Sequence, residues 1–136
     1  MNADELISER LTALPEVGFA LLFGSRAQET GRPDSDVDVA VFLSPRLTGD
    51  ERWRLLLRLQ ATLAHLGDVD VVVLNDAPPL LAHRALCGKR LFVRDREAYV
   101  RFAIRTIAIA EDERYFRELH RRTRQQRLEE GRFGRP

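Results

Sequence analysis

The chain has 136 residues and a formal net charge of only +1. This length suits one folded domain, and 44% hydrophobic with 32% charged residues excludes a chain that is disordered throughout. The near-neutral charge gives no electrostatic reason to require nucleic acid as a partner.

The first predicted element is a helix that ends before Pro15. Asn2 followed by Glu5 is typical of a helix N-terminus. Apolar residues then recur at helical spacing, which predicts one buried face: Leu6, Ile7, Leu11 and Leu14.

Residues 16–23 form an apolar run that predicts a short buried strand. Gly24 follows it directly, allows a sharp turn and has no Cβ to block a ligand approaching the backbone. Ser25 is placed to cap a short helix from Arg26 to about Thr30. Free N–H groups at a helix N-terminus bind anions, so this turn predicts a polyphosphate site. Arg26 either steadies a phosphate or lies on the surface.

Ten residues separate Ser25 from two aspartates, Asp36 and Asp38, in a second predicted strand. Strand periodicity places both side chains on one face, roughly 6–7 Å apart. Two ionised carboxylates at that distance repel by about 2–2.5 kcal/mol at an effective dielectric constant near 20, so we expect a divalent cation there. Hard oxygen ligands beside a phosphate predict Mg²⁺, with Mn²⁺ as the alternative. Taken singly, Asp36 could end the turn and Asp38 could face solvent.

A capping-box pattern at Thr48 and Glu51 predicts a helix from Asp50 to about Leu66. Trp53 is predicted to anchor the core rather than to stack on a base. The residues expected on the apolar face recur at helical spacing: Trp53, Leu56, Leu57, Gln60, Leu63 and Ala64.

The third strand begins near residue 69 and contains Asp70 inside a β-branched run. Asp68 follows Gly67 and is typical of a turn residue. We therefore predict Asp70, rather than Asp68, as the third carboxylate of the site.

The remaining chain predicts a short helix over 79–86 that Gly88 ends, a strand over 89–94 and a long helix from Asp95 to about Leu128. The long helix has one predicted apolar face: Tyr99, Phe102, Ala103, Thr106, Ile107 and Ala110. Alternating strands and helices indicate an α/β domain. The arginine-rich end of the chain is either a solvated helix end or a contact for an acidic partner or RNA.

Cys87 is the single cysteine and cannot form an internal disulfide, which indicates a reducing compartment. The sequence contains no signal peptide and no apolar run of membrane-spanning length. We expect a cytoplasmic protein that has no membrane partner.

Three motifs, at residues 24–27, 35–41 and 69–74, resemble those of the polymerase β-like nucleotidyltransferases. The small size resembles the minimal nucleotidyltransferases that are antitoxin partners of HEPN toxins. The resemblance implies an α/β fold with a small mixed sheet, flanking helices and a C-terminal helix. It implies one domain over 1–136, with a core at about 16–94 and a helical tail at about 95–136. One departure is that Gly31 comes later than the glycine of many relatives, which leaves the motif spacing intact.

The predicted reaction transfers a nucleoside monophosphate to a hydroxyl, with two Mg²⁺ ions bound by Asp36 and Asp38. Asp70 would bind the second ion and orient the hydroxyl proton, while Gly24 and Ser25 would fix the phosphates. The resemblance implies ATP as donor, a tyrosine of a cognate HEPN toxin as acceptor, and a hetero-oligomer with that toxin.

Two other classes of function stay open at this point. A small-molecule nucleotidyltransferase of the aminoglycoside type would need extra chain for a substrate pocket, and this chain has little to spare. A non-catalytic antitoxin that acts by binding alone would have no need for clustered carboxylates.

Overall fold

The structure, a computed structural model, describes residues 2–24 and 37–131. A four-stranded mixed sheet lies at its centre, in the order β3-β2-β1-β4. Its strands are β1 Val17–Phe23, β2 Val37–Leu43, β3 Val69–Val73 and β4 Lys89–Val93. β1 runs antiparallel to β2 and β4, whereas β2 and β3 are parallel.

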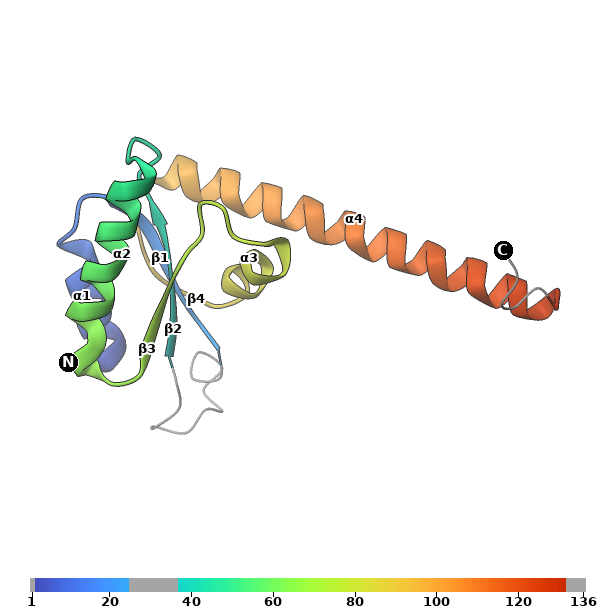
Figure 1. Ribbon diagram of the computed structural model, residues 1–136, viewed down its shortest axis with the longest axis horizontal. Coiled ribbons are helices and arrows are strands. Elements are labelled where there is room, and N and C mark those ends of the chain that lie inside the picture. The colour runs from blue at the N-terminus through green and yellow to red at the C-terminus, as the bar shows by residue number, and fades with distance from the viewer. Residues whose placement is uncertain (1, 25–36, 132–136) are drawn as a thin grey trace.

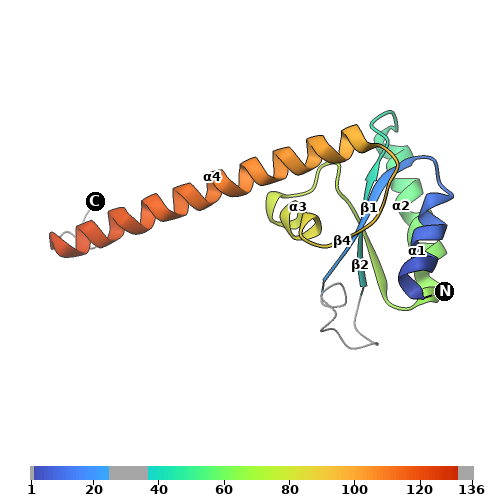
Figure 2. The same ribbon diagram turned by 180° about the vertical axis from the view of Figure 1, so that it is seen from behind.

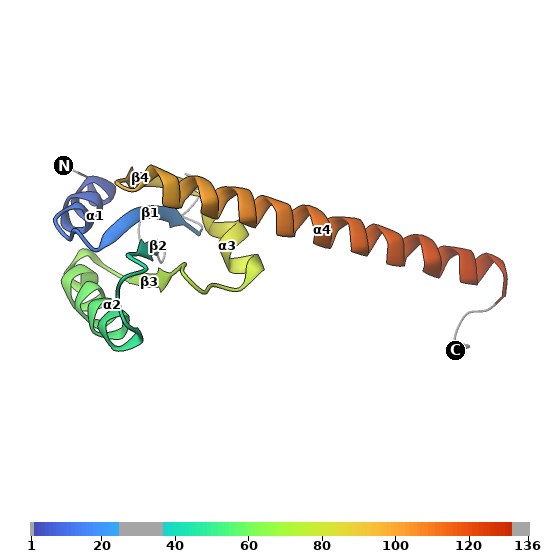
Figure 3. The ribbon, with the colours of Figure 1, turned by 90° about the horizontal axis from the view of Figure 1, so that it is seen from above.

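Helices cover both faces of this sheet. α1 Ala3–Thr12 and α2 Gly49–Leu63 lie on one face, and a short 3₁₀ turn, Ala64–Leu66, follows α2. α3 Pro79–Leu86 and the first part of α4 Arg96–Glu129 lie on the other (Figure 1, and from above in Figure 3). Parallel strands need a crossover connection, and α2 supplies it between β2 and β3. The expected mixed sheet with flanking helices and a long C-terminal helix is confirmed.

Strand periodicity divides the core into two halves. In β2, Val37, Val39 and Val41 pack towards α1 and α2. Ala40, from the alternate positions, packs towards α3 and α4. β1 is buried at every position because it is central and covered on both sides.

Aromatic contacts attach α4 to the sheet. Phe19 of β1 stacks on Phe42 of β2, with ring centroids 5.0 Å apart. Tyr99 meets Phe19 edge-on at 5.2 Å, and Phe102 lies at 5.5 Å from the same ring. Phe19 is thus the centre of an aromatic cluster that fixes the N-terminal part of α4, and such pairs add to the stabilisation that area burial gives.

The predicted helix boundaries are confirmed closely where a side chain caps the helix. Thr48 Oγ1 accepts from the N–H of Glu51, and the Glu51 carboxylate accepts from the N–H of Thr48. That second hydrogen bond lowers the pKa of Glu51. Asp95 caps α4 by accepting from the N–H of Ala98.

Four residues predicted on apolar faces are exposed. In α2, Trp53 is 61% exposed, and Leu57 and Ala64 are exposed as well. α2 instead buries Leu55, Leu59 and Leu63, which follow each other at intervals of four residues. Ile107 of α4 is 52% exposed, while Thr106 beside it is buried. Both helices carry apolar side chains on more than one side. Tertiary packing decides which of these sides is buried, and it buries a different side from the one predicted.

None of the helices within residues 2–24 and 37–131 is both long and apolar enough to cross a lipid bilayer.

Arg94, directly after β4, ties the end of α1 to the sheet. Its guanidinium donates to the carbonyl oxygens of Leu14 and Val17, each at 2.6 Å, and to that of Thr12. A planar guanidinium can serve several carbonyl groups at once, whereas a methionine of similar length can serve none.

We expect Arg94→Met to lower the free energy of unfolding by about 1–2 kcal/mol in urea titrations, because three carbonyl groups lose a charged donor. Arg96→Met is the matched control, since Arg96 is an exposed residue in the first turn of α4, and it should change stability by less than about 0.5 kcal/mol. Equal stability of the two variants would contradict this role of Arg94.

Candidate active site

The parallel register of β2 and β3 brings two predicted site residues together. Asp38 of β2 lies directly opposite Asp70 of β3, and neighbouring strands are about 4.8 Å apart. Both belong to the alternate positions that face α3 and α4, as Ala40 does two residues further on. Two carboxylates therefore share one face at one end of the sheet.

Gly24 borders the same place from the end of β1. Its φ is +93°, and a Cβ at this position would lie 2.7 Å from Asp38 Oδ2. A side chain here would be strained by the backbone and would also collide with the Asp38 carboxylate. The predicted need for glycine at this turn therefore has two physical causes in the structure.

Three predicted site residues, Ser25, Arg26 and Asp36, lie outside the described residues. Within the described ranges, no three or more carboxylate, histidine or cysteine side chains group as metal ligands. Asp38 and Asp70 alone still offer paired hard oxygen donors, which is the ligand chemistry that suits Mg²⁺ or Mn²⁺.

The structure also separates Asp70 from Asp68. Gly67 has a φ of +115°, and Asp68 uses its carbonyl oxygen to accept from the N–H of Val37 at 2.9 Å. Asp68 thus begins the pairing of β3 with β2, while Asp70 sits inside the ladder beside Asp38. Both residues line a shallow cavity of about 460 Å³, and the choice of Asp70 as the third carboxylate stays a prediction.

Gln60 of α2 lies beside the pair and was not predicted from the sequence as part of the site. Its Nε2 donates to the carbonyl oxygen of Val69 at 3.1 Å, and its Oε1 accepts from the N–H of Val71 at 2.6 Å. β3 is an edge strand, so no further strand pairs with its outer side. The Gln60 amide makes the hydrogen bonds that such a strand would make, at the residues before and after Asp70. Its position on the predicted apolar face of α2 concealed that role.

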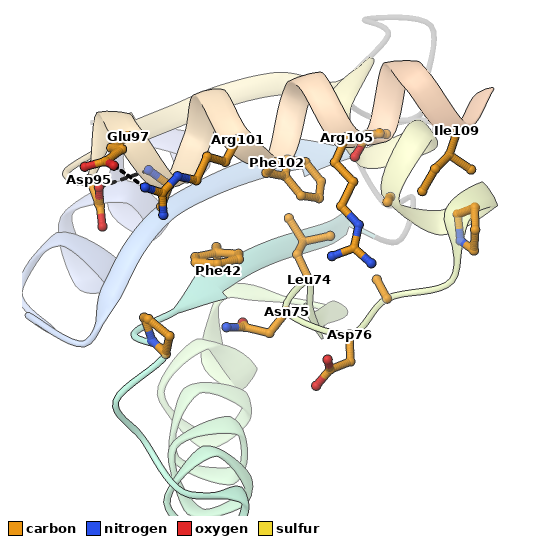
Figure 4. A pocket seen from close by; sticks show the side chains of 16 residues that line it. Phe42, Leu74, Asn75, Asp76, Asp95, Glu97, Arg101, Phe102, Arg105 and Ile109 are labelled. Carbon is orange, nitrogen blue, oxygen red and sulfur yellow. Dashed lines mark hydrogen bonds and ion pairs between the residues drawn. The ribbon is translucent and has the colours of Figure 1, made fainter. Parts of the chain in front are cut away.

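A larger cavity, of about 590 Å³, lies at the other end of the same face, between α3, α4 and the end of β3. Phe42 and Leu74 line it, each four residues beyond Asp38 or Asp70 and so roughly 13 Å along the strands. Figure 4 shows Arg105 extending into it towards Leu74 and Asn75. None of the described predicted site residues lines it, so cavity size does not mark the carboxylate pair.

We expect Gln60→Leu to lower the free energy of unfolding by about 1–3 kcal/mol, because the Val69 carbonyl and the Val71 N–H lose their partner. Gln60→Glu keeps an acceptor for Val71 and should fall between this variant and the native chain. Urea unfolding measures both changes, and a Gln60→Leu variant as stable as the native chain would show that the amide does not hold the edge.

The chain is similar to known proteins in both sequence and structure. The sequence matches the family "Polymerase beta, Nucleotidyltransferase" over residues 5–97. It is 31% identical over 110 residues to the protein adenylyltransferase MntA of Shewanella oneidensis, covering 80% of this chain and 77% of that protein.

Two solved structures show the same arrangement of elements. A chain in the crystal structure of a toxin–antitoxin with AMP-PNP is 28% identical, with a TM-score of 0.62, over 88% of this chain and 94% of that one. A chain of the toxin–antitoxin MntA–HepT is 26% identical, with a TM-score of 0.58, over 86% and 92%. The chain therefore belongs to the polymerase β nucleotidyltransferase family, as a minimal nucleotidyltransferase homologous to MntA.

Proposed function

We propose that this chain is a protein adenylyltransferase antitoxin, which transfers AMP from ATP to a hydroxyl of its cognate HEPN toxin and thereby neutralises it. The observation that carries the proposal is the alignment of Asp38 with Asp70 beside Gly24. The relative MntA is named for this chemistry, and a similar chain was solved as a toxin–antitoxin with an ATP analogue.

In the proposed reaction, the acceptor oxygen bonds to the α-phosphorus of ATP, and the bond from that phosphorus to the bridging oxygen of the β-phosphate breaks. Pyrophosphate leaves with that oxygen. Asp70 orients the acceptor hydroxyl and takes its proton. Gly24, with Ser25 and Arg26 beyond it, holds the outer phosphates, so that position and charge supply most of the rate enhancement.

The carboxylates Asp36, Asp38 and Asp70 are the residues that would hold two Mg²⁺ ions. When bound, such ions offset the charge of the triphosphate and lower the pKa of the acceptor hydroxyl. Support comes from the donor chemistry of Asp38 and Asp70, which lie close enough on neighbouring strands to share a cation.

A tyrosine of the toxin is the acceptor that we propose. The resemblance to antitoxin partners of HEPN toxins supports a protein acceptor. A phenol has a pKa near 10, so it gives up its proton more readily than an aliphatic hydroxyl does. A folded acceptor also supplies its own shape and needs only a docking surface.

A small-molecule acceptor has less support. The cavity large enough for one lies at the far end of the sheet face, roughly 13 Å from the carboxylate pair along the strands. An acceptor bound there would have to span that distance to reach Asp70. The paired carboxylates likewise argue against an antitoxin that acts by binding alone, since binding has no use for the repulsion between them.

We expect Asp38→Asn and Asp70→Asn each to reduce AMP transfer at least a hundredfold, because each removes a proposed cation ligand and Asp70 also takes the proton. Asp68→Asn is the matched control and should retain near-native transfer. The measurement is intact-mass spectrometry of the purified cognate toxin after incubation with ATP and Mg²⁺. If Asp68→Asn fails while Asp70→Asn is active, the third carboxylate is Asp68. An unmodified toxin alongside a labelled aminoglycoside or RNA would refute the proposed acceptor.

Gly24→Ala tests the contact with Asp38, with Gly67→Ala as its matched control. Both glycines have positive φ, so both variants should lose about 1 kcal/mol of stability from backbone strain. Only Gly24 has the Asp38 carboxylate within reach of an added Cβ, whereas nothing lies within 4 Å at Gly67. AMP transfer should therefore fall in Gly24→Ala alone. Equal transfer by the two variants would show that the close approach has no role.

A further inference from the structure

Charge is unevenly distributed around the outer half of α4, residues 111–129. This part of the helix projects away from the other elements (Figures 1 and 2), and all of its residues are exposed except Glu118, which is half-buried. The direction of each side chain can be counted from Thr106, which is 6% exposed and marks the side of α4 that packs against the rest of the protein. An α-helix turns by about 100° per residue, so sequence spacing places every later residue relative to a line along the helix through Thr106.

Four arginines of the outer half lie on the Thr106 side of the helix. Arg124 follows Thr106 by 18 residues, which is about five full turns, and Arg117 follows it by 11 residues, which is about three turns. Arg121 and Arg127 lie about 60° to either side of the Thr106 line. We call the set the basic side: Arg117, Arg121, Arg124 and Arg127.

The acidic residues that α4 carries beyond Arg117 point elsewhere. Glu118 and Glu129 lie about 120–140° from the Thr106 line, so Glu113, one turn before Arg117, is the acidic residue that remains on this side of the outer half. Arg121 pairs with Glu118 at 2.7 Å, but the arginine side chain is 71% exposed. Exposed pairs of this kind contribute little stability, so Arg121 is able to turn to a partner.

The helix dipole does not account for the basic side. Cations are favoured near a helix C-terminus, but the effect acts all round the helix and fades within the last turn. Arg117 and Arg124 lie well before Glu129, the last residue of α4, by more than one turn in each case. Neighbouring arginines on one side of a helix also repel one another. A helix side of one sign therefore indicates a surface for a partner of the opposite sign.

The basic side lies on the same side of the molecule as the carboxylate pair. Phe102 packs towards α3 and the sheet face that contains Ala40, and Thr106 borders the cavity between α3 and α4. Asp38 and Asp70 belong to that same sheet face. Figures 1 and 3 show α4 passing along α3 and continuing beyond it. A large body that rests against the basic side therefore also lies on the side of the protein that carries the carboxylates.

We propose that the basic side docks an acidic surface of the acceptor protein and thereby holds the acceptor hydroxyl at the carboxylate pair. The inference rests on the proposed function, since it takes the cognate toxin as that protein. Arginine guanidinium groups bind carboxylates through two parallel hydrogen bonds and are enriched in protein interfaces. The basic side runs for about 15 Å along the helix and begins about 16 Å beyond Thr106. The acidic surface and the acceptor hydroxyl are therefore separate parts of one folded partner.

A protein surface fits the basic side better than RNA does. Residues 111–130 contain six acidic residues and six arginines, and the whole chain has a net charge of only +1. An extended polyanion is attracted by a broad positive potential, which this balance of charges does not provide. Short-range pairing along one side of a helix instead suits a limited patch of carboxylates on a folded protein.

The first test is binding of the full chain to the purified cognate toxin without ATP, measured by isothermal titration calorimetry. Arg117→Glu with Arg124→Glu should weaken binding at least about tenfold, because carboxylates then face carboxylates. Arg114→Glu with Arg122→Glu is the matched control, since it makes the same change of charge about 80° and 160° from the Thr106 line. The control should change the affinity less than about threefold. Far-UV circular dichroism verifies that both variants keep their helix content.

The second test identifies the chemistry of the partner surface. Lys89 is the single lysine of the chain, so Arg124→Lys adds one amine on the basic side and Arg122→Lys adds one away from it. A carbodiimide joins a lysine amine to a carboxylate in contact with it. Mass spectrometry of the treated complex should find position 124, but not position 122, joined to an Asp or Glu of the toxin.

The outcomes separate this inference from the proposed reaction. Native affinity of the Arg117→Glu, Arg124→Glu variant for a toxin that still gains AMP would overturn the docking surface and leave the reaction intact. A toxin that binds through the basic side but gains no AMP would refute the reaction and leave the docking surface intact. Loss of binding to a single-stranded oligoribonucleotide, with toxin binding unchanged, would assign the basic side to RNA and overturn the proposal.

Discussion

The parallel pairing of β2 with β3 is the constraint on which the candidate site depends. This register sets Asp38 beside Asp70, and a slip of one residue would turn one of them to the opposite face, towards α1 and α2. Several separate features hold the register. The crossover through α2 delivers β3 in the parallel direction, Gln60 satisfies the outer edge of β3, and the Asp68 carbonyl starts the ladder at Val37.

The same register creates an electrostatic cost that the rest of the molecule must offset. Asp38 and Asp70 lie opposite each other on neighbouring strands, so their carboxylates repel each other when both are ionised. β1, buried along its whole length, and the aromatic cluster around Phe19 provide a rigid, apolar support for that pair. A repulsive pair held in place by a firm core is the arrangement expected where a cation and a triphosphate bind.

Much of the fold was predictable because its signals are local. Apolar runs marked the strands, the capping pair Thr48 and Glu51 placed the start of α2, and a β-branched run predicted β3. The errors at Trp53, Leu57, Ala64 and Ile107 have a common cause. All four lie on helices with apolar residues on more than one side, where only tertiary packing decides which side is buried. Gln60 and Arg94 were missed because backbone groups elsewhere in the chain are their partners, and sequence spacing carries no signal for such contacts.

The most direct test of the account is to locate the cation itself. Crystals of the complex with Mn²⁺ and a non-hydrolysable ATP analogue, measured at the manganese absorption edge, would place the ion by its anomalous signal. The account predicts a Mn²⁺ ion bonded at about 2.1–2.2 Å to carboxylate oxygens of both Asp38 and Asp70. A nucleotide-bound ion that contacts neither carboxylate, or that uses Asp68 in place of Asp70, would contradict it.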